Sequence, residues 1–183
     1  MYNMFRTSDS TSLSPKEMSL LHHLNANYTP AIAQAVLVPL IEQTAPISLR
    51  ALDWTVVNWS KQRNAVCSST IPGQMTNIHC AYKTALHFWK RRLFDPFRRR
   101  RRIEVVVGDE VYETTLGQAN FILFAHVTGI FAFTLSHLRE IEDDMNRVML
   151  LKKKGSKKDK QNTDVINPKF GIAYRCPTIV TFH

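Results

Sequence analysis

Residues 102–124 read RIEVVVGDEVYETTLGQANFILF, and this stretch decides the fold class. Its first half contains two runs rich in β-branched side chains, 102–107 and 111–115, on either side of a short glycine-containing loop. This pattern predicts an antiparallel hairpin with a loop of about three residues. A helical pattern follows over 116–153, with Gly129 as a candidate break. Because so short a hairpin must pack on helices, we expect an α+β domain.

Four further helices are predicted ahead of the hairpin. Hydroxyl N-caps at Ser14, Thr29 and Ser48, the first two followed by proline, mark three helix starts, and Glu17 at the third position completes a capping box in the first. The first helix is expected to bury Met18, Leu21 and Leu24, the second to end near Thr44 and the third near Arg63. A fourth helix covers 78–92 and stops before Pro96, and residues 65–77 are predicted as a loop with a short strand at Ala65–Ser68.

The ends of the chain differ in composition from this helical part. Residues 1–13 are polar and predict a mobile tail, so we place the domain at 14–151. Residues 152–164 have the composition of a flexible basic linker. The final segment, 165–183, is predicted as a tail with a strand at Ile179–Phe182.

Positive charge is concentrated in two segments of this 183-residue chain, which has a formal net charge of +9. One segment lies within 83–102 and contains five consecutive arginines, and the other lies within 147–160 and is dominated by lysine. Such clustering favours a dedicated polyanion-binding surface over general solubility.

Arginine matches the oxygens of phosphate with a fixed fork of donors, so the arginine-rich segment predicts contact with nucleic acid. Asp95 and Pro96 are expected to fix the turn that aims these side chains. An acidic protein, an import receptor or an anionic lipid could take the place of the nucleic acid. The predicted contact residues are Lys83, Lys90, Arg91, Arg92, Arg98, Arg99, Arg100, Arg101, Arg102, Lys152, Lys153 and Lys154.

The aromatic side chains interleaved with this charge have two interpretations. They could stack on bases of single strands, but aromatic residues at helical spacing beside a proline turn are more often core. The second interpretation is favoured for most of Tyr82, Phe88, Trp89, Phe94 and Phe97.

The sequence predicts no enzyme, cofactor, small-molecule substrate, catalytic residue or metal site. The three cysteines are odd in number and lack paired spacing, and no histidine lies at a recognised ligand spacing. The acidic residues Glu140, Glu142, Asp143 and Asp144 are expected on the solvent face of a helix. The uncharged segment 114–138 is long enough to cross a bilayer, but polar side chains interrupt it, so membrane insertion is not expected.

Four motifs resemble a family of small basic proteins encoded by nucleocytoplasmic large DNA viruses. They are Ser48–Trp54 with Asn58–Lys61, Tyr82-Lys83, Phe94–Phe97 with Arg99, Arg100, Arg102 and Ile103, and Thr114–Phe121. The family pattern has a cysteine at the position of Arg98 and an acidic residue at that of Arg101. Within 121–135 the family is also charged, which implies a helix outside the membrane. The resemblance implies a viral context, with no activity attached.

These observations lead to one principal hypothesis and one alternative. The first is a non-enzymatic basic protein that binds the phosphate backbone of nucleic acid with low sequence specificity. The alternative is a structural or assembly protein of the virion or viral factory that docks on an acidic viral or host protein. Either protein is expected in the cytoplasm or nucleus of the host cell or in the virion, and not to be secreted.

Overall fold

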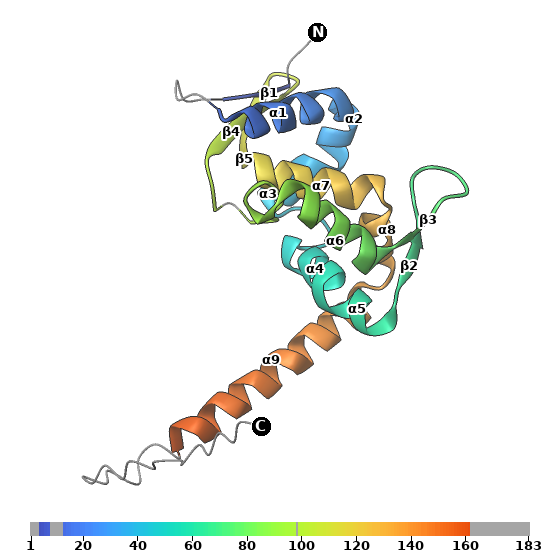
Figure 1. Cartoon of the computed structure of the whole chain (residues 1–183), viewed down its shortest axis with the longest axis vertical. Helices are drawn as coiled ribbons and strands as arrows, with labels where there is room; N and C mark the ends of the chain where they lie inside the picture. Colours follow the sequence, from blue (N-terminus) through green and yellow to red (C-terminus); the bar gives the residue numbers. More distant parts are fainter. Residues whose placement is uncertain (1–3, 8–12, 98, 162–183) are drawn as a thin grey trace, which may run out of the picture. The chain divides into compact units, whose positions relative to one another are not determined.

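The computed structural model describes residues 4–7, 13–97 and 99–161, with the backbone alone over 152–161. The chain divides into two compact units, 1–146 and 147–183. The first unit combines helices with a three-stranded sheet of order β1-β4-β5 and a two-stranded sheet of β2 and β3 (Figure 1). The predicted α+β class, mainly helical, is confirmed.

Helices and strands alternate along the chain with short π-helical or 3-10 segments, which are labelled η. In chain order the elements are β1 (Phe5–Arg6), α1 (Pro15–Asn27), α2 (Pro30–Ile32), η1 (Ala33–Leu37), α3 (Val38–Glu42), α4 (Leu49–Trp54), η2 (Thr55–Trp59), α5 (Ser60–Arg63), β2 (Val66–Ser68), β3 (Met75–Asn77), α6 (Ile78–Trp89), η3 (Arg91–Leu93), β4 (Arg102–Val107), β5 (Glu110–Thr115), α7 (Leu116–Val127), α8 (Ile130–Ser136) and α9 (Leu138–Gln161).

Helix α1 begins with the capping box that its sequence predicts. The Ser14 hydroxyl accepts from the backbone N–H of Glu17, whose carboxylate accepts from the backbone N–H of Ser14 at 2.9 Å. Leu24 is buried as predicted, but the rest of the predicted face is wrong, because α1 buries Glu17 and Leu20 whereas Met18 is 41% exposed and Leu21 is partly buried. Apolar side chains occur on both faces of this helix, so spacing alone does not select between them.

The second and third predicted helices are confirmed, and each contains a π-helical segment that the sequence does not reveal. Thr29 and Ser48 cap their starts through side-chain oxygens. The helices end at Gln43 and Asn64, which adopt left-handed backbone conformations. Between the third predicted helix and α6, the predicted loop contains a small hairpin of β2 and β3, with Cys67 opposite Thr76.

The predicted hairpin is present as β4 and β5, with Ile103 opposite Thr114 and Val107 opposite Glu110. The connection has two residues where about three were expected, because Glu110 already belongs to β5. Gly108 adopts φ of +63°, and a positive φ at the first position of a two-residue turn suits the twist of the strands.

Residues 4–6 correct the prediction that the first thirteen residues form a mobile tail. Phe5 pairs with Val105 of β4 and is only 1% exposed. The side-chain amide of Asn25 accepts from the backbone N–H of Phe5 and donates to its carbonyl. The segment is polar on average, but Met4 and Phe5 are both buried and anchor it to the domain.

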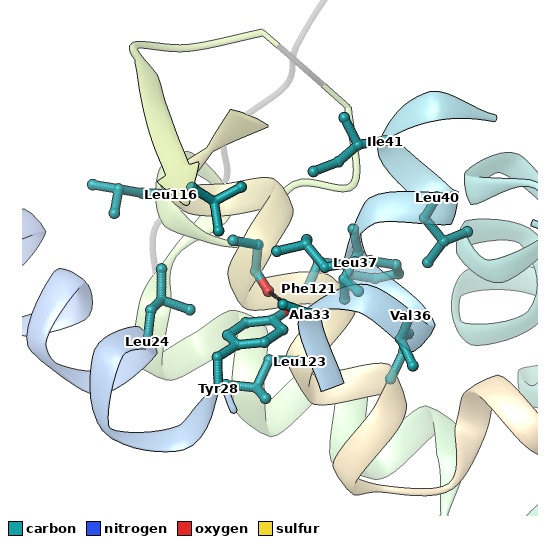
Figure 2. Close-up of a cluster of buried hydrophobic side chains, with 14 of the residues drawn as sticks. Leu24, Tyr28, Ala33, Val36, Leu37, Leu40, Ile41, Leu116, Phe121 and Leu123 are labelled. Atoms are coloured by element: carbon teal, nitrogen blue, oxygen red, sulfur yellow. Dashed lines mark hydrogen bonds between the residues drawn. The ribbon is translucent and has the colours of Figure 1, made fainter. Parts of the chain in front are cut away.

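Helix α7 lies at the centre of the first unit. Figure 2 shows the apolar cluster where α7 packs against α1 and the helix running from α2 to α3, with Leu24, Leu37 and Phe121 among its members. The hydroxyl of Tyr28 donates to the carbonyl of Ala119 at 3.0 Å, so the polar group in this cluster is satisfied (Figure 2).

The long helical region after the hairpin is broken at Gly129, as predicted, and Gly129 adopts φ of +78°. Helix α9 continues to Gln161, so the backbone of 152–161 is helical where a flexible linker was expected. The linker was predicted from charge and polarity alone, and that prediction did not take into account that lysine is a good helix former. The strand predicted at Ile179–Phe182 lies outside the described residues, as does the rest of the linker and tail.

Candidate nucleic-acid interface

The turn between α6 and β4 carries most of the predicted contact residues, and α7 holds this turn in place. Gln118 donates from its side-chain amide to the carbonyl of Pro96 at 3.0 Å and accepts from the Thr114 hydroxyl at 2.9 Å. Asn120 donates to the carbonyl of Leu93 at 2.8 Å. Both amide side chains are buried, so these bonds are made without competition from water.

Two further contacts bring the turn close to the first turn of α7. The backbone N–H of Asp95 donates to the carbonyl of Gly117 at 3.3 Å. A Cβ atom on Gly117 would lie 3.3 Å from the carbonyl oxygen of Arg92, which is tighter than ordinary packing. Phe94 is buried and meets the rings of Phe121 and Phe124 edge-on, with centroids 5.4 and 5.2 Å away. The turn between the two groups of arginines is therefore held against α7 by hydrogen bonds and ring contacts.

The structure brings most of the predicted residues together around this turn, which we call the arginine cluster: Lys90, Arg91, Arg92 and residues 99–102. Their side chains are exposed at Lys90, Arg91, Arg92, Arg99, Arg100 and Arg102 and partly buried at Arg101. Lys83 is exposed on α6, one of the elements beside the cluster. Arg98 and the side chains of Lys152, Lys153 and Lys154 lie outside the described residues.

Three arginines of the cluster are paired with carboxylates of the protein itself. Arg92 lies 3.0 Å from Glu17, Arg99 lies 3.4 Å from Asp95, and Arg102 lies 3.5 Å from Glu113. The sequence hypothesis expected these guanidinium groups to stand ready for a polyanion, so this part of it needs correction. The paired arginine side chains nevertheless stay 68%, 65% and 42% exposed.

The backbone of Lys90 is strained. This residue ends α6 with φ of +65° and ψ of 158°, a region of backbone conformation that is populated almost only by glycine. The conformation redirects the chain from α6 into the 3-10 segment that carries Arg91 and Arg92. A strained residue at the entrance of the cluster is consistent with a functional constraint on this turn.

Acidic and phenolic groups lie near the cluster, and the sequence does not predict that Asp53 and Tyr82 are among them. Burial and the nearby charge of Asp95 raise the pKa of Asp53, while Arg99 and Arg91 oppose this shift. Burial and Asp53 likewise raise the pKa of Tyr82. Asp53, Tyr82 and Asp95 come from three motifs far apart in the sequence, and the fold brings them within electrostatic reach of Arg91.

Most of the aromatic residues near the cluster are at least partly buried, as the interpretation that they belong to the core expects, and one is an exception. Phe94 is buried, and Tyr82, Trp89 and Phe97 are partly buried. Phe88 is 63% exposed, and the ammonium group of Lys16 lies 5.9 Å from the centre of its ring. The guanidinium of Arg99 lies 5.0 Å from the centre of the Phe97 ring, a distance at which cation–π attraction operates.

The other candidate groups are dispersed. Within residues 4–7, 13–97 and 99–161, no three His, Cys, Asp or Glu side chains are arranged to hold a metal ion. Cys67 and Cys80 are free thiols, the first buried and the second exposed. Asp144 was predicted on a solvent face but is 3% exposed, because it accepts from the Trp54 indole at 3.0 Å.

The uncharged segment 114–138 forms two helices at an angle to each other. In the part of the chain that the structure describes, no single helix combines enough length and hydropathy to cross a bilayer. Helices α7 and α8 meet these criteria only when taken together, across a bend of 74°.

The fold and the turn define a mainly helical α+β protein with an arginine cluster held against its central helix. Residues 4–170 match the family of unknown function DUF7197, and the chain belongs to this family. Over 174 residues it is 27% identical to Uncharacterized protein L507 of Acanthamoeba polyphaga mimivirus, covering 90% of this chain and 67% of the mimivirus protein. The similarity to uncharacterised giant-virus proteins is thus confirmed. No solved structure matches the chain.

Proposed function

We propose that this protein binds nucleic acid through its phosphate backbone, using the arginine cluster. The observation that carries the proposal is that exposed guanidinium groups gather on one turn whose backbone is fixed by buried hydrogen bonds. Arg91 and Arg100 are exposed, and no ion pair engages either of them among the described residues. A rigid backbone lowers the entropy that these side chains lose when they bind phosphate.

The carboxylates beside the cluster moderate this binding without preventing it. Ion pairs with an exposed arginine contribute little to stability, about 0–1 kcal/mol, and salt weakens them further. A phosphate can therefore compete for Arg92, Arg99 and Arg102, whose side chains are largely exposed. The same carboxylates allow the arginines to lie close together before the nucleic acid arrives, because each pair lowers the local repulsion between like charges.

The lysines of the second basic segment are proposed as an additional, less specific contact. The backbone of 152–161 is helical within α9, and lysine attracts phosphate as a point charge. We expect Lys152, Lys153 and Lys154 to increase affinity for long nucleic acids without setting any preference for sequence.

A salt titration tests the proposal on the full chain. Fluorescence anisotropy with a labelled single-stranded and a labelled duplex DNA should show binding that weakens steeply as salt increases. Replacing Arg91 and Arg100 together by glutamine should lower the slope of log affinity against log salt by about two, since each lost phosphate contact accounts for about one. No binding at low salt, or binding indifferent to salt, contradicts the proposal.

The matched control removes the same charge elsewhere. Lys61 and Arg139 are exposed and lie outside the cluster, so replacing both by glutamine should leave the slope nearly unchanged. If this control loses as much affinity as the Arg91 and Arg100 variant, net charge rather than the cluster is responsible, and the proposed site is wrong.

A second function, docking on another protein during assembly, is favoured by one separate observation. The hairpin of β2 and β3 exposes apolar side chains, with Val66 at 44%, Ile71 at 56% and Met75 at 64%. Grouped exposed apolar side chains are typical of protein contacts. Replacing Met75 by lysine should then abolish capture of a partner from infected cells while leaving DNA binding unchanged. Unchanged capture contradicts this second function.

A further inference from the structure

A small cavity of about 100 Å³ lies inside the arginine cluster. Its walls come from α1, the 3-10 segment, the strand entry and the first turn of α7. The residues that matter most in lining it are Glu17, Arg92, Arg100, Arg101, Leu116 and Gly117. Segments distant in the sequence therefore converge on one hollow with arginine on more than one side.

The charges around the cavity favour an anion. Arg92 is already paired with Glu17 at its wall, so the exposed Arg100 adds a positive charge that this glutamate does not offset. One oxygen of Glu17 accepts from the Ser14 N–H and hydroxyl, at 2.9 and 2.7 Å, and its other oxygen accepts from Arg92 at 3.0 Å. The glutamate is thus held by the helix cap, and its charge offsets only part of the arginine charge.

The size of the cavity limits what can enter. Its volume of about 100 Å³ has room for a group of the size of phosphate. A phosphate monoester has three free oxygens and a charge between about −1.5 and −2 at pH 7, so it can accept from several guanidinium groups at once. A phosphodiester inside a strand has only two free oxygens and continues on both sides.

We propose that this cavity binds the terminal phosphate monoester of a nucleic acid strand. The inference rests on the proposed function, because the exposed Lys90, Arg91 and Arg99 would receive the backbone that follows the terminal phosphate. It adds to that function a preference for strand ends that carry phosphate.

Calorimetry on the full chain tests the preference. Three single-stranded oligonucleotides of one sequence are compared, with a 5′-phosphate, with a 3′-phosphate and with neither. One phosphorylated strand should bind about tenfold more tightly than the unphosphorylated strand, as expected for added charge-assisted hydrogen bonds. Equal affinities for all three overturn the inference and leave the proposed function intact. Absence of binding for all three overturns both.

Two variants locate the preference in the cavity. Arg100→Gln should remove the difference between phosphorylated and unphosphorylated strands, whereas Arg91→Gln, outside the cavity lining, should weaken both strands equally. Glu17→Gln should enlarge the difference, because glutamine can still accept from Ser14 while the repelling charge is lost. A smaller difference in Glu17→Gln, or no change in Arg100→Gln, contradicts the assignment.

The source of the phosphate is decided in the same experiment. A phosphoserine peptide and inorganic phosphate are titrated beside the oligonucleotides. Both should bind more weakly than the phosphorylated strand, because neither reaches Lys90 and Arg91. If the phosphopeptide binds more tightly than the phosphorylated strand, the cavity is a site for phosphoproteins and the assignment to nucleic acid is wrong.

Discussion

The two ends of α7 hold neighbouring segments in different ways. At its first turn, buried side-chain amides of Gln118 and Asn120 bond the turn that carries the arginine cluster. At its last turn, α7 holds the β2–β3 hairpin through a main-chain acceptor, since the carbonyl of Val127 accepts from the N–H and hydroxyl of Thr70. The first end thus relies mainly on two side chains of α7, whereas the second relies on a main-chain carbonyl and on the close approach of backbones just beyond it.

Gly129 shows how strict that close approach is. A Cβ atom at this position would lie 1.9 Å from the carbonyl oxygen of Ser68.

Gly129→Ala should have the largest effect. The left-handed backbone and the overlap with Ser68 together should cost roughly 2–6 kcal/mol of unfolding free energy in denaturant titrations. Gly73→Ala is the matched control within the hairpin, because Gly73 has the same φ of +78° with nothing within 4 Å of its Cβ position. It should cost only about 1–2 kcal/mol. If both variants lose the same unfolding free energy, the close approach of Gly129 to the backbone of Ser68 does not hold the hairpin at the end of α7.

Asn120→Leu tests the amide end and comes next. The leucine side chain has the same number of heavy atoms and the same branching but leaves the carbonyl of Leu93 buried without its donor, which should cost about 1–3 kcal/mol. The arginine cluster should also lose order, so the salt slope of DNA binding should become shallower in the folded variant. If the unfolding free energy falls as expected but DNA affinity stays unchanged, the hydrogen bond from α7 does not order the arginine cluster.

Lys90→Gly should stabilise the protein. Glycine adopts the observed backbone conformation without strain, so unfolding free energy should rise by about 1 kcal/mol. Lys90→Ala is the control, because it removes the same charge but keeps the Cβ atom and hence the strain. A gain in the alanine variant as large as that in the glycine variant would mean that charge repulsion, and not backbone strain, is relieved.

The smallest effect is a dependence on pH at the first helix. Hydrogen bonds from Ser14, more than the charge of Arg92, lower the pKa of Glu17 from its ordinary value of 4.5. A lowered pKa means that the stabilisation is complete above 4.5 and is lost as the pH falls through the lowered value. Glu17→Gln should flatten stability against pH in this acid range. An unchanged profile would show that the carboxylate does not stabilise the cap.

The two ends of α7 also differ in what sequence can predict. The position of Gly129 in a helical pattern predicts a break there, and the arginine run is conspicuous from charge alone. In the sequence, Gln118 and Asn120 look like ordinary polar residues at the start of a helix. No local pattern predicts that their amides donate to carbonyl groups of a turn more than twenty residues earlier in the chain. Contacts of this kind depend on the tertiary arrangement.

The ion pairs of the cluster escape prediction for the same reason. Arg92 and Glu17 lie far apart in the chain, and the sequence assigns Glu17 only a capping role within its own helix. The capping role is confirmed, and the second oxygen of the same carboxylate contacts Arg92 as well. Local rules predicted the helix start correctly, whereas the partner across the fold required the structure.

The edge strand β1 sets an order on folding during synthesis. Phe5 leaves the ribosome long before its partner Val105 exists, so β1 cannot join the sheet until the hairpin of β4 and β5 has been translated. In the interval Phe5 can dock only on α1, through Asn25 and the ring of Tyr28. Strand β1 is therefore made long before the strand with which it pairs, and a nascent chain stalled before Val105 would leave this aromatic strand accessible to chaperones.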